Sequence, residues 1–222
     1  MIFKQKSLIV SCQAEGNDPF NSPEGVAMFA KAAEMGGAHG IRSEGIEKTK
    51  KIINEVSIPV IGLIKSSFGD GSVRITGTLN EVEELLDIGC KIIAVDGTNR
   101  IRDEMTGPQF ISLIKQKYCC SIMADISTIN EAIESQKSGA DYISTTLNGY
   151  TPETINDNNG EPNYLLINTL SHIINLPIFA EGRISSPGQA KKMIELGAYG
   201  VVVGTIITRP RVITQMFTNI MK

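Results

Sequence analysis

The sequence predicts an α/β protein that folds as a single (β/α)8 barrel, the TIM-barrel architecture, over residues 1–222. Its length lies at the lower edge of the range for one such barrel. A helix-to-strand junction recurs four times along the chain, and eight short apolar runs lack the alternation of half-exposed strands. Such runs are typical of parallel strands that are buried on both faces. A doubly wound open sheet is the alternative fold.

The recurring junction is a glycine followed by a small residue and a short apolar run. It stands where amphipathic helical patterns end, at Gly37-Ala38, Gly89-Cys90, Gly139-Ala140 and Gly197-Ala198. Glycine suits the left-handed position that stops a helix, and the small residue lets the chain turn closely beneath the next strand. The repeat therefore predicts successive helix-to-strand units.

Four of the predicted strands follow these junctions, among them Ile92–Val95 and Val201–Val203. The other four are Leu8–Ser11, Pro59–Ile64, Ser121–Asp125 and Pro177–Ala180. Two of these begin with proline, which cannot extend the preceding helix and is tolerated at the first residue of a strand. Strands and helices then alternate along the chain, as a closed parallel barrel requires.

Amphipathic helices are predicted between the strands, for example over Asn80–Asp87 and Ser186–Leu196. The second begins at Ser186-Pro187, an N-cap residue followed by proline at the first helical position. The last helix, Pro210–Met221, carries an apolar face that its own barrel or a neighbouring subunit must cover.

Composition narrows the possible partners. The formal charge is only −3, and no cluster of Lys and Arg is dense enough to follow a nucleic-acid backbone. The N-terminus has too short an apolar stretch for a signal peptide, and no run approaches the ~20 apolar residues of a membrane span. The four cysteines show no CxxC spacing, which favours free thiols in a reducing compartment. We therefore expect a cytoplasmic protein without nucleic-acid or membrane partners.

Lys65 and Glu181 are the strongest candidates for catalysis. In a parallel barrel the reactive face is formed by the carboxyl ends of the strands, and these two residues close the third and seventh strands. A lysine beside a carboxylate is suited to proton transfer, although a structural ion pair would use the same residues. Other polar strand ends, such as Ser66 and Ser127, have helix capping as an equally good explanation.

A phosphate site is predicted after the last two strands, where barrels of this kind commonly bind phosphate. Gly182 and Gly204 stand there at matching places, and glycine exposes backbone N–H groups to an anion. Arg183, Thr205 and Arg209 follow closely in the sequence.

No metal site is predicted. The histidines are His39, at the start of the second strand, and His172, inside the sixth helix, and neither position reaches the barrel mouth. Without imidazole or clustered carboxylates there, we expect chemistry that uses no metal ion.

Six segments at the strand ends carry a resemblance to a known family. They are Val10–Gln13, Gly40–Arg42, Pro59–Lys65, Ala94–Thr98, Met123–Ser127 and Ile178–Arg183. With them, nearly the whole chain resembles the N-acylglucosamine-6-phosphate 2-epimerases, bacterial barrels of amino-sugar and sialic acid catabolism. Gly97 departs from the alanine expected in many relatives, but this changes no titratable group.

The resemblance implies inversion at C2 of N-acyl-D-mannosamine 6-phosphate, without a cofactor. Lys65 would be the principal acid/base and Glu181 the second proton-handling group. Asp125 would hydrogen-bond the sugar or orient Lys65, and the remaining site residues would hold the substrate and its phosphate. Those substrate-binding residues are Gln13, Arg42 and Arg209, and the phosphate-binding residues are Gly182, Arg183, Gly204 and Thr205. The resemblance also implies a homodimer.

Three other functions use the same residues. In a Schiff-base aldolase, Lys65 would bond covalently to a carbonyl substrate. In a flavin-binding barrel, the glycine loops would hold the phosphate of the cofactor. A phosphosugar-binding protein would have the phosphate site without catalysis.

Overall fold

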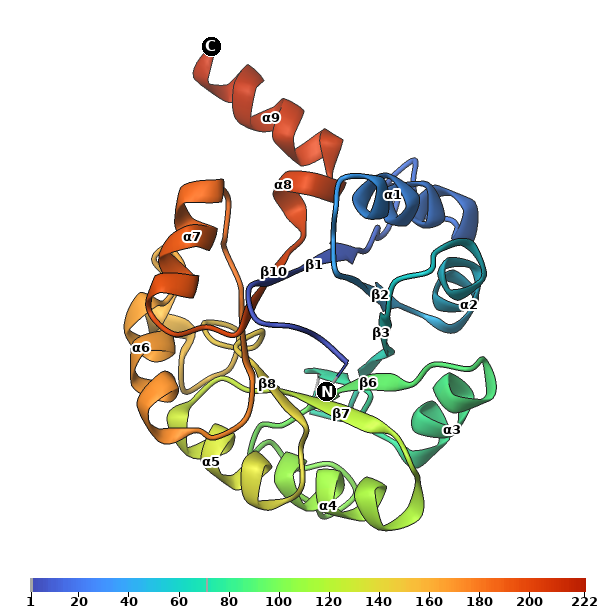
Figure 1. Cartoon of the computed structure of the whole chain (residues 1–222), viewed down its shortest axis with the longest axis vertical. Coiled ribbons are helices and arrows are strands. Elements are labelled where there is room, and N and C mark those ends of the chain that lie inside the picture. The colour runs from blue at the N-terminus through green and yellow to red at the C-terminus, as the bar shows by residue number, and fades with distance from the viewer. Residues whose placement is uncertain (1, 71) are drawn as a thin grey trace.

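Eight parallel strands close into a barrel in the computed structural model, which describes residues 2–70 and 72–222 (Figure 1). Around the barrel they are β1 (Ser7–Cys12), β2 (Gly40–Glu44), β3 (Val60–Leu63), β6 (Ile92–Asp96), β7 (Ser121–Asp125), β8 (Tyr142–Ser144), β9 (Ile178–Glu181) and β10 (Gly200–Val203). The first and last strands pair in register, with Ile9 opposite Val202. The predicted barrel is therefore confirmed, and the open sheet is excluded.

Large side chains fill the interior of the barrel, so it is a packed core and not a channel. Ile9, Ile61, Ile92 and Met123 belong to this cluster and are at most 1% exposed. Phe3 joins them from the chain before β1, and its ring lies 5.5 Å from that of Phe179 in an edge-on arrangement. The polar site is thereby confined to the opposite, carboxyl end of the strands.

Helices surround the barrel in the order that the sequence predicts. They are α1 (Pro23–Met35), α2 (Ile46–Glu55), α3 (Leu79–Asp87), α4 (Gly107–Lys117), α5 (Ile129–Lys137), α6 (Tyr164–Ile173), α7 (Pro187–Glu195), α8 (Thr205–Thr208) and α9 (Pro210–Ile220), with a 3-10 turn at Ile155–Asp157. The Ser186 side chain caps α7 by accepting a bond from the Gln189 N–H at 3.2 Å, and Pro187 follows it, as predicted. None of the helices described combines the length and apolarity that a membrane span needs.

A short hairpin after β3 was not predicted. Its strands β4 (Lys65–Ser67) and β5 (Val73–Ile75) pair antiparallel outside the barrel. The barrel strand ends at Leu63, and Thr76 returns the chain with its N–H bonded to the Ile64 carbonyl at 2.7 Å. Three residues per strand are too few for a periodicity signal. Lys65 therefore lies on this hairpin and not on a barrel strand.

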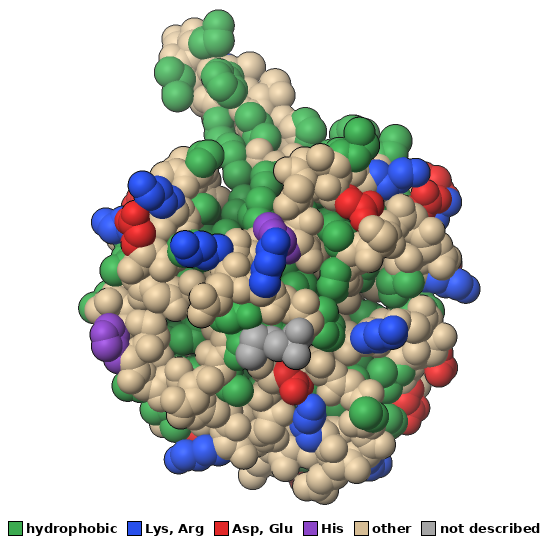
Figure 2. Space-filling view, viewed as in Figure 1, with side chains coloured by type: hydrophobic (Ala, Val, Ile, Leu, Met, Phe, Trp, Pro, Cys, Tyr) green, Lys and Arg blue, Asp and Glu red, His purple; other side chains and the backbone are tan. Residues whose placement is uncertain are grey.

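The last helix, α9, extends away from the ring of helices between α7 and α1 (Figure 1). None of its residues is buried, although Phe217 is apolar and 67% exposed and Ile220 is 88% exposed. Hydrophobic side chains run along its projecting surface (Figure 2). The predicted apolar helix is confirmed, and its own barrel does not cover the apolar side chains.

Candidate active site

A pocket of about 560 Å³ opens at the carboxyl ends of the strands. Residues that were predicted from the sequence line it together: Gln13, Arg42, Lys65, Glu181, Gly182, Arg183, Gly204, Thr205 and Arg209. They lie on five different barrel strands or on the segments that follow those strands. Among the predicted site residues, Asp125 lies behind this lining, fully buried.

A buried ion pair forms the floor of the site. Arg42 lies in the middle of β2 and Asp125 at the end of β7, and their side chains are only 1% and 0% exposed. The guanidinium binds the carboxylate through both oxygens, with Nη1 3.0 Å from Oδ1. The same Nη1 lies 3.5 Å from Glu181 Oε2. One arginine thus sits between two carboxylates.

Burial changes the proton affinity of both partners. It raises the pKa of the Asp125 carboxyl to about 6, with Arg42 opposing the shift. Burial alone would lower the pKa of Arg42, but the charges of Asp125 and Glu181 outweigh it, so that pKa lies above its ordinary value. Arg42 is therefore a fixed positive charge, whereas Asp125 can change its charge in mildly acidic solution.

The Glu181 carboxylate is held by hydroxyl groups from the β8 end. Its Oε2 lies 2.8 Å from Thr146 Oγ1 and 3.1 Å from Ser144 Oγ. Thr146 Oγ1 also lies 2.9 Å from Asp125 Oδ1. Because a hydroxyl has one proton to donate, Thr146 links the two carboxylates and can satisfy only one of them at a time.

Lys65 faces the pocket from the hairpin and pairs with Glu15 rather than with Glu181. Its ammonium group bonds to Glu15 Oε1, and its side chain is 35% exposed. Arg209 lies 3.6 Å from the same carboxylate oxygen. The hydrogen bond from Lys65 is the main cause of a lowered pKa at Glu15. Sequence reasoning missed Glu15, although it follows β1 in the loop where site residues are expected.

The part of the pocket where the sequence predicts a phosphate site combines glycines with a helix start. Gly182 has φ of +110°, and no heavy atom would lie within 4 Å of an added Cβ. Gly204 precedes the first turn of α8, where backbone N–H groups have no acceptor within the helix. Thr205 opens that turn beside the pocket. These groups leave room and hydrogen-bond donors for an anion.

Arg183 fixes a neighbouring loop with its side chain. Its Nη1 donates to the Asn148 carbonyl at 2.9 Å and its Nε to the Glu161 carbonyl at 2.7 Å. The guanidinium also lies 5.8 Å from the centre of the Tyr150 ring. Arg183 thereby holds the 148–161 loop, whose Tyr150 and Gly160 line the pocket.

Comparison with known proteins identifies the family. Residues 26–222 match the NanE family, described as "Putative N-acetylmannosamine-6-phosphate epimerase". The chain belongs to this epimerase family. The class of enzyme predicted from the sequence, a carbohydrate-phosphate epimerase, is the class of this family.

Relatives in the epimerase family match along nearly their whole length. A protein of Caldanaerobacter subterraneus subsp. tengcongensis is 48% identical, over 98% of this chain and 92% of the relative. One of Clostridioides difficile is 44% identical, over 96% of this chain and 94% of the relative. Both carry the name "Putative N-acetylmannosamine-6-phosphate 2-epimerase".

Solved structures agree with the fold. The N-acetylmannosamine-6-phosphate 2-epimerase from Clostridium perfringens superimposes with a TM-score of 0.91 at 40% identity, covering 97% of this chain and 93% of that one. Thiamine phosphate pyrophosphorylase from Pyrococcus furiosus has a TM-score of 0.61 at 15% identity, covering 94% and 90% of the two chains. The second likeness reflects the barrel fold alone.

The histidines of this epimerase-family chain lie where the sequence placed them. His39 precedes β2, and its Nδ1 accepts the Leu8 N–H at 3.2 Å. His172 is on α6 and bonds to its own helix. Within residues 2–70 and 72–222, no three side chains of His, Cys, Asp or Glu gather as potential metal ligands.

Proposed function

We propose that this chain interconverts N-acyl-D-mannosamine 6-phosphate and N-acyl-D-glucosamine 6-phosphate by inversion at C2, in the breakdown of amino sugars such as sialic acids. The observation that carries the proposal is that Lys65 and Glu181 line one pocket with a cradle for phosphate. The names of the full-length relatives support the same substrate. The proposed reaction uses protein side chains for proton transfer, with no metal ion and no cofactor.

The chemistry follows from the position of C2 in the open-chain sugar. C2 lies next to the C1 aldehyde, so removal of its proton gives an enolate with the charge on the C1 oxygen. Return of a proton to the opposite face of C2 inverts the centre. Lys65 is the principal group that exchanges this proton, and Glu181 is the second. Thr146 and Ser144 hold the Glu181 carboxylate in place.

The remaining residues bind and orient the substrate. Gln13 and Arg42 hold the sugar, and Arg42 brings a fixed positive charge to the enolate. Asp125 orients Arg42, because both of its oxygens bind that guanidinium below the pocket surface. The phosphate is bound by Gly182, Arg183, Gly204, Thr205 and Arg209. Substrate phosphate would compete with Glu15 for Arg209.

The test is incubation with N-acetylmannosamine 6-phosphate in deuterated water, followed by proton NMR. We expect the N-acetylglucosamine 6-phosphate signals to appear while deuterium enters at C2. Lys65→Met should reduce both by about 10²- to 10⁴-fold, the usual contribution of a general acid/base. The matched control is Lys115→Met, which removes a partly exposed ion pair with Asp141. This variant should retain full activity.

If Lys65→Met still exchanged the C2 proton with deuterated water, Lys65 would not have its proposed role. The alternative functions give different results with the same substrate. A Schiff-base aldolase would be trapped covalently at Lys65 by borohydride. A flavin-binding barrel would be purified as a yellow protein.

We also propose a homodimer in the cytoplasm. The exposed apolar side chains of α9 support the dimer, since such a surface is usually covered by a partner. All four cysteines lie in the described residues and are free, and Cys12 and Cys90 are buried. Free thiols are usual in a reducing compartment.

A further inference from the structure

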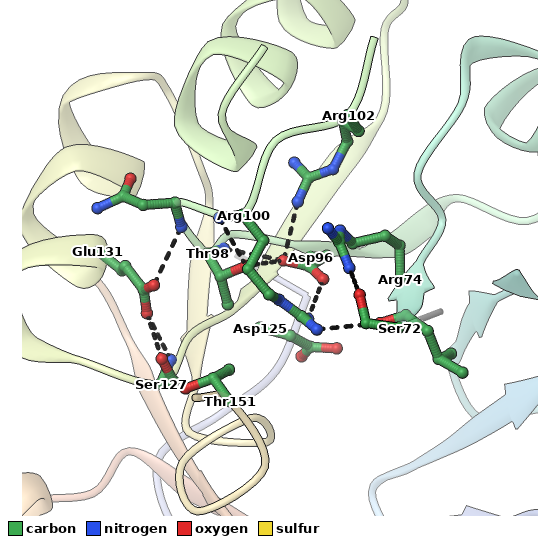
Figure 3. A network of polar contacts seen from close by, with 12 residues as sticks. Ser72, Arg74, Asp96, Thr98, Arg100, Arg102, Asp125, Ser127, Glu131 and Thr151 are labelled. Atoms are coloured by element: carbon green, nitrogen blue, oxygen red, sulfur yellow. Dashed lines mark hydrogen bonds and ion pairs between the residues drawn. The ribbon is translucent and has the colours of Figure 1, made fainter. Parts of the chain in front are cut away.

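A cluster of buried charges lies beside the active site and takes no part in the proposed proton transfer. Asp96, at the end of β6, is fully buried, and Arg100 and Arg102 both pair with it. Arg74 lies next to them (Figure 3). Arg74 and Arg102 are only 1% and 2% exposed. This Asp96 cluster adjoins the hairpin of β4 and β5, because Arg74 lies on β5.

Asp96 holds the loop of residues 97–106 in a fixed shape. Its Oδ2 lies 2.5 Å from Arg100 Nη2, and its Oδ1 lies 2.9 Å from Arg102 Nη2. Oδ1 also accepts the Thr98 N–H at 2.9 Å. The loop thus wraps around one carboxylate, and Arg100 is held in one orientation by its second bond, from Nε to Thr98 Oγ1 at 3.0 Å.

This loop is bonded to the hairpin in both directions. Arg100 Nη1 donates to the Val73 carbonyl on β5 at 3.2 Å. In return, Arg74 on β5 donates from Nη2 to the Ile101 carbonyl at 3.2 Å. The side chain of each segment therefore bonds to the backbone of the other.

Lys65 lies on β4 of the hairpin, and Arg100 bonds to β5, the strand that pairs with β4. Lys65 pairs with Ile75, and Ser67 pairs with Val73, in the register of β4 and β5. Both Lys65 and Ile75 line the pocket. A hairpin with three residues in each strand is not stable by itself, so its position depends on bonds to the rest of the protein. Ser66, bonded to Glu81, supplies a separate tether.

Stability alone does not account for so many buried charges. Arg102 Nε and Nη1 and Arg74 Nε have no hydrogen-bond partner in the described structure. Replacing buried ion pairs by apolar residues of similar volume is often neutral or stabilising. What a planar guanidinium supplies is direction, because its donors point along fixed axes to two acceptors at once.

We propose that Arg100, held by Asp96, is a positioning residue for Lys65: it fixes the hairpin so that the ammonium group reaches C2 of the sugar. This inference rests on the proposed role of Lys65 in proton transfer. Arg100 itself is not among the described residues that line the pocket. Its loss displaces Lys65 without removing the pocket that binds the phosphosugar.

The test compares Arg100→Met, Arg100→Lys and Lys115→Met. In Arg100→Met we expect kcat to fall by about 10- to 100-fold, since a displacement of ~1 Å in a reacting group can cost 100-fold. KM should change less than threefold, because the phosphate site lies after β9 and β10. Arg100→Lys keeps a charge that can pair with Asp96 or reach Val73, and should recover part of kcat. Lys115→Met should behave as wild type.

Amide hydrogen exchange provides a readout that needs no activity. We expect faster exchange at residues 65–67 and 72–75 in Arg100→Met, with the barrel strands unchanged. Unchanged kcat together with unchanged exchange in the hairpin would overturn the positioning role. The positioning role would also be overturned if Arg100→Met raised KM and lowered the melting temperature along with kcat, and if Arg100→Lys recovered none of the activity. If the wild type fails to epimerise while the hairpin still loosens in Arg100→Met, the proposed function has failed and the tether itself stands.

Discussion

Arg42 and Asp125 show how a single buried pair can organise an active site at some expense in stability. Desolvating two charges costs several kcal/mol for each ion, and their attraction recovers it only with good geometry. Here the pair uses both carboxylate oxygens, and the arginine also reaches toward Glu181. The pair therefore fixes the direction of a charge at the pocket floor, which an apolar pair could not do.

The raised pKa of Asp125 predicts a pH dependence of activity. As pH falls through about 6, Asp125 binds a proton and loses its charge pairing with Arg42. We expect kcat/KM to decline below that pH. In Asp125→Asn, which is neutral throughout, this limb should disappear, and overall activity should be lower because Arg42 is less well oriented.

The substrate phosphate also titrates near pH ~6, so the two enzymes must be compared with the same substrate. Any difference between their pH profiles of kcat/KM is then due to the titration of Asp125. Identical acid limbs in both proteins would show that Asp125 does not control this transition. Circular dichroism at each pH separates loss of activity from unfolding.

At the scale of elements, the repeated glycine junctions are the clearest link from sequence to backbone. Gly37, Gly89, Gly139 and Gly197 all adopt positive φ, from +84° to +99°. Each stands where a helix ends and the chain turns toward the next strand, as the pattern predicts. An L-residue in such a conformation costs about 1–2 kcal/mol.

Gly37 and Gly197 provide a matched pair for testing this position. An added Cβ at Gly37 meets no atom within 4 Å, whereas at Gly197 it would lie 2.5 Å from Ser171 Cβ. We expect Gly37→Ala to lower the free energy of unfolding by about 1 kcal/mol. Gly197→Ala should lower the free energy of unfolding by a further ~1–3 kcal/mol, because the added Cβ clashes with Ser171. Guanidinium unfolding curves measure both, and equal losses would mean that Ser171 moves aside.

The hairpin of β4 and β5 is the element that sequence patterning could not predict. Its strands are too short for periodicity, and it is bonded to Arg100 and Glu81, two residues outside the hairpin. Lys65 was assigned correctly to the barrel mouth because the apolar strand before it ends at Leu63. Its partner Glu15 was not predicted, since pairing between loops depends on how those loops fold over the mouth.

For the whole molecule, pairing of the first and last strands is the contact that closes the barrel. We propose that residues 1–222 form one domain, because every barrel strand has two neighbours in the closed sheet. The helix α9 extends away from the ring of helices around the barrel (Figure 1).

The exposed apolar side chains of α9 predict a dimer in solution. Light scattering should give about twice the chain mass of 24.0 kDa. The double variant Phe217→Glu and Ile220→Glu should shift the protein to the monomer, because each charge would be buried in the interface. Lys191→Glu, on the exposed face of α7, is the control for an added acid. A wild-type monomer at micromolar concentration would contradict the proposal.

The sequence by itself determined the barrel fold and most of the residues that lie at the carboxyl ends of its strands. Apolar strands without alternation require burial on both faces, and a closed parallel barrel then brings all the strand ends together. Lys65, Glu181, Arg42 and the glycines at 182 and 204 could be predicted to line the pocket for that reason. Only the tertiary structure decided which of these groups bond to one another. The pairing of Arg42 with Asp125, of Lys65 with Glu15 and of Arg100 with Val73 joins residues far apart in the chain, and such contacts depend on packing that no local pattern encodes.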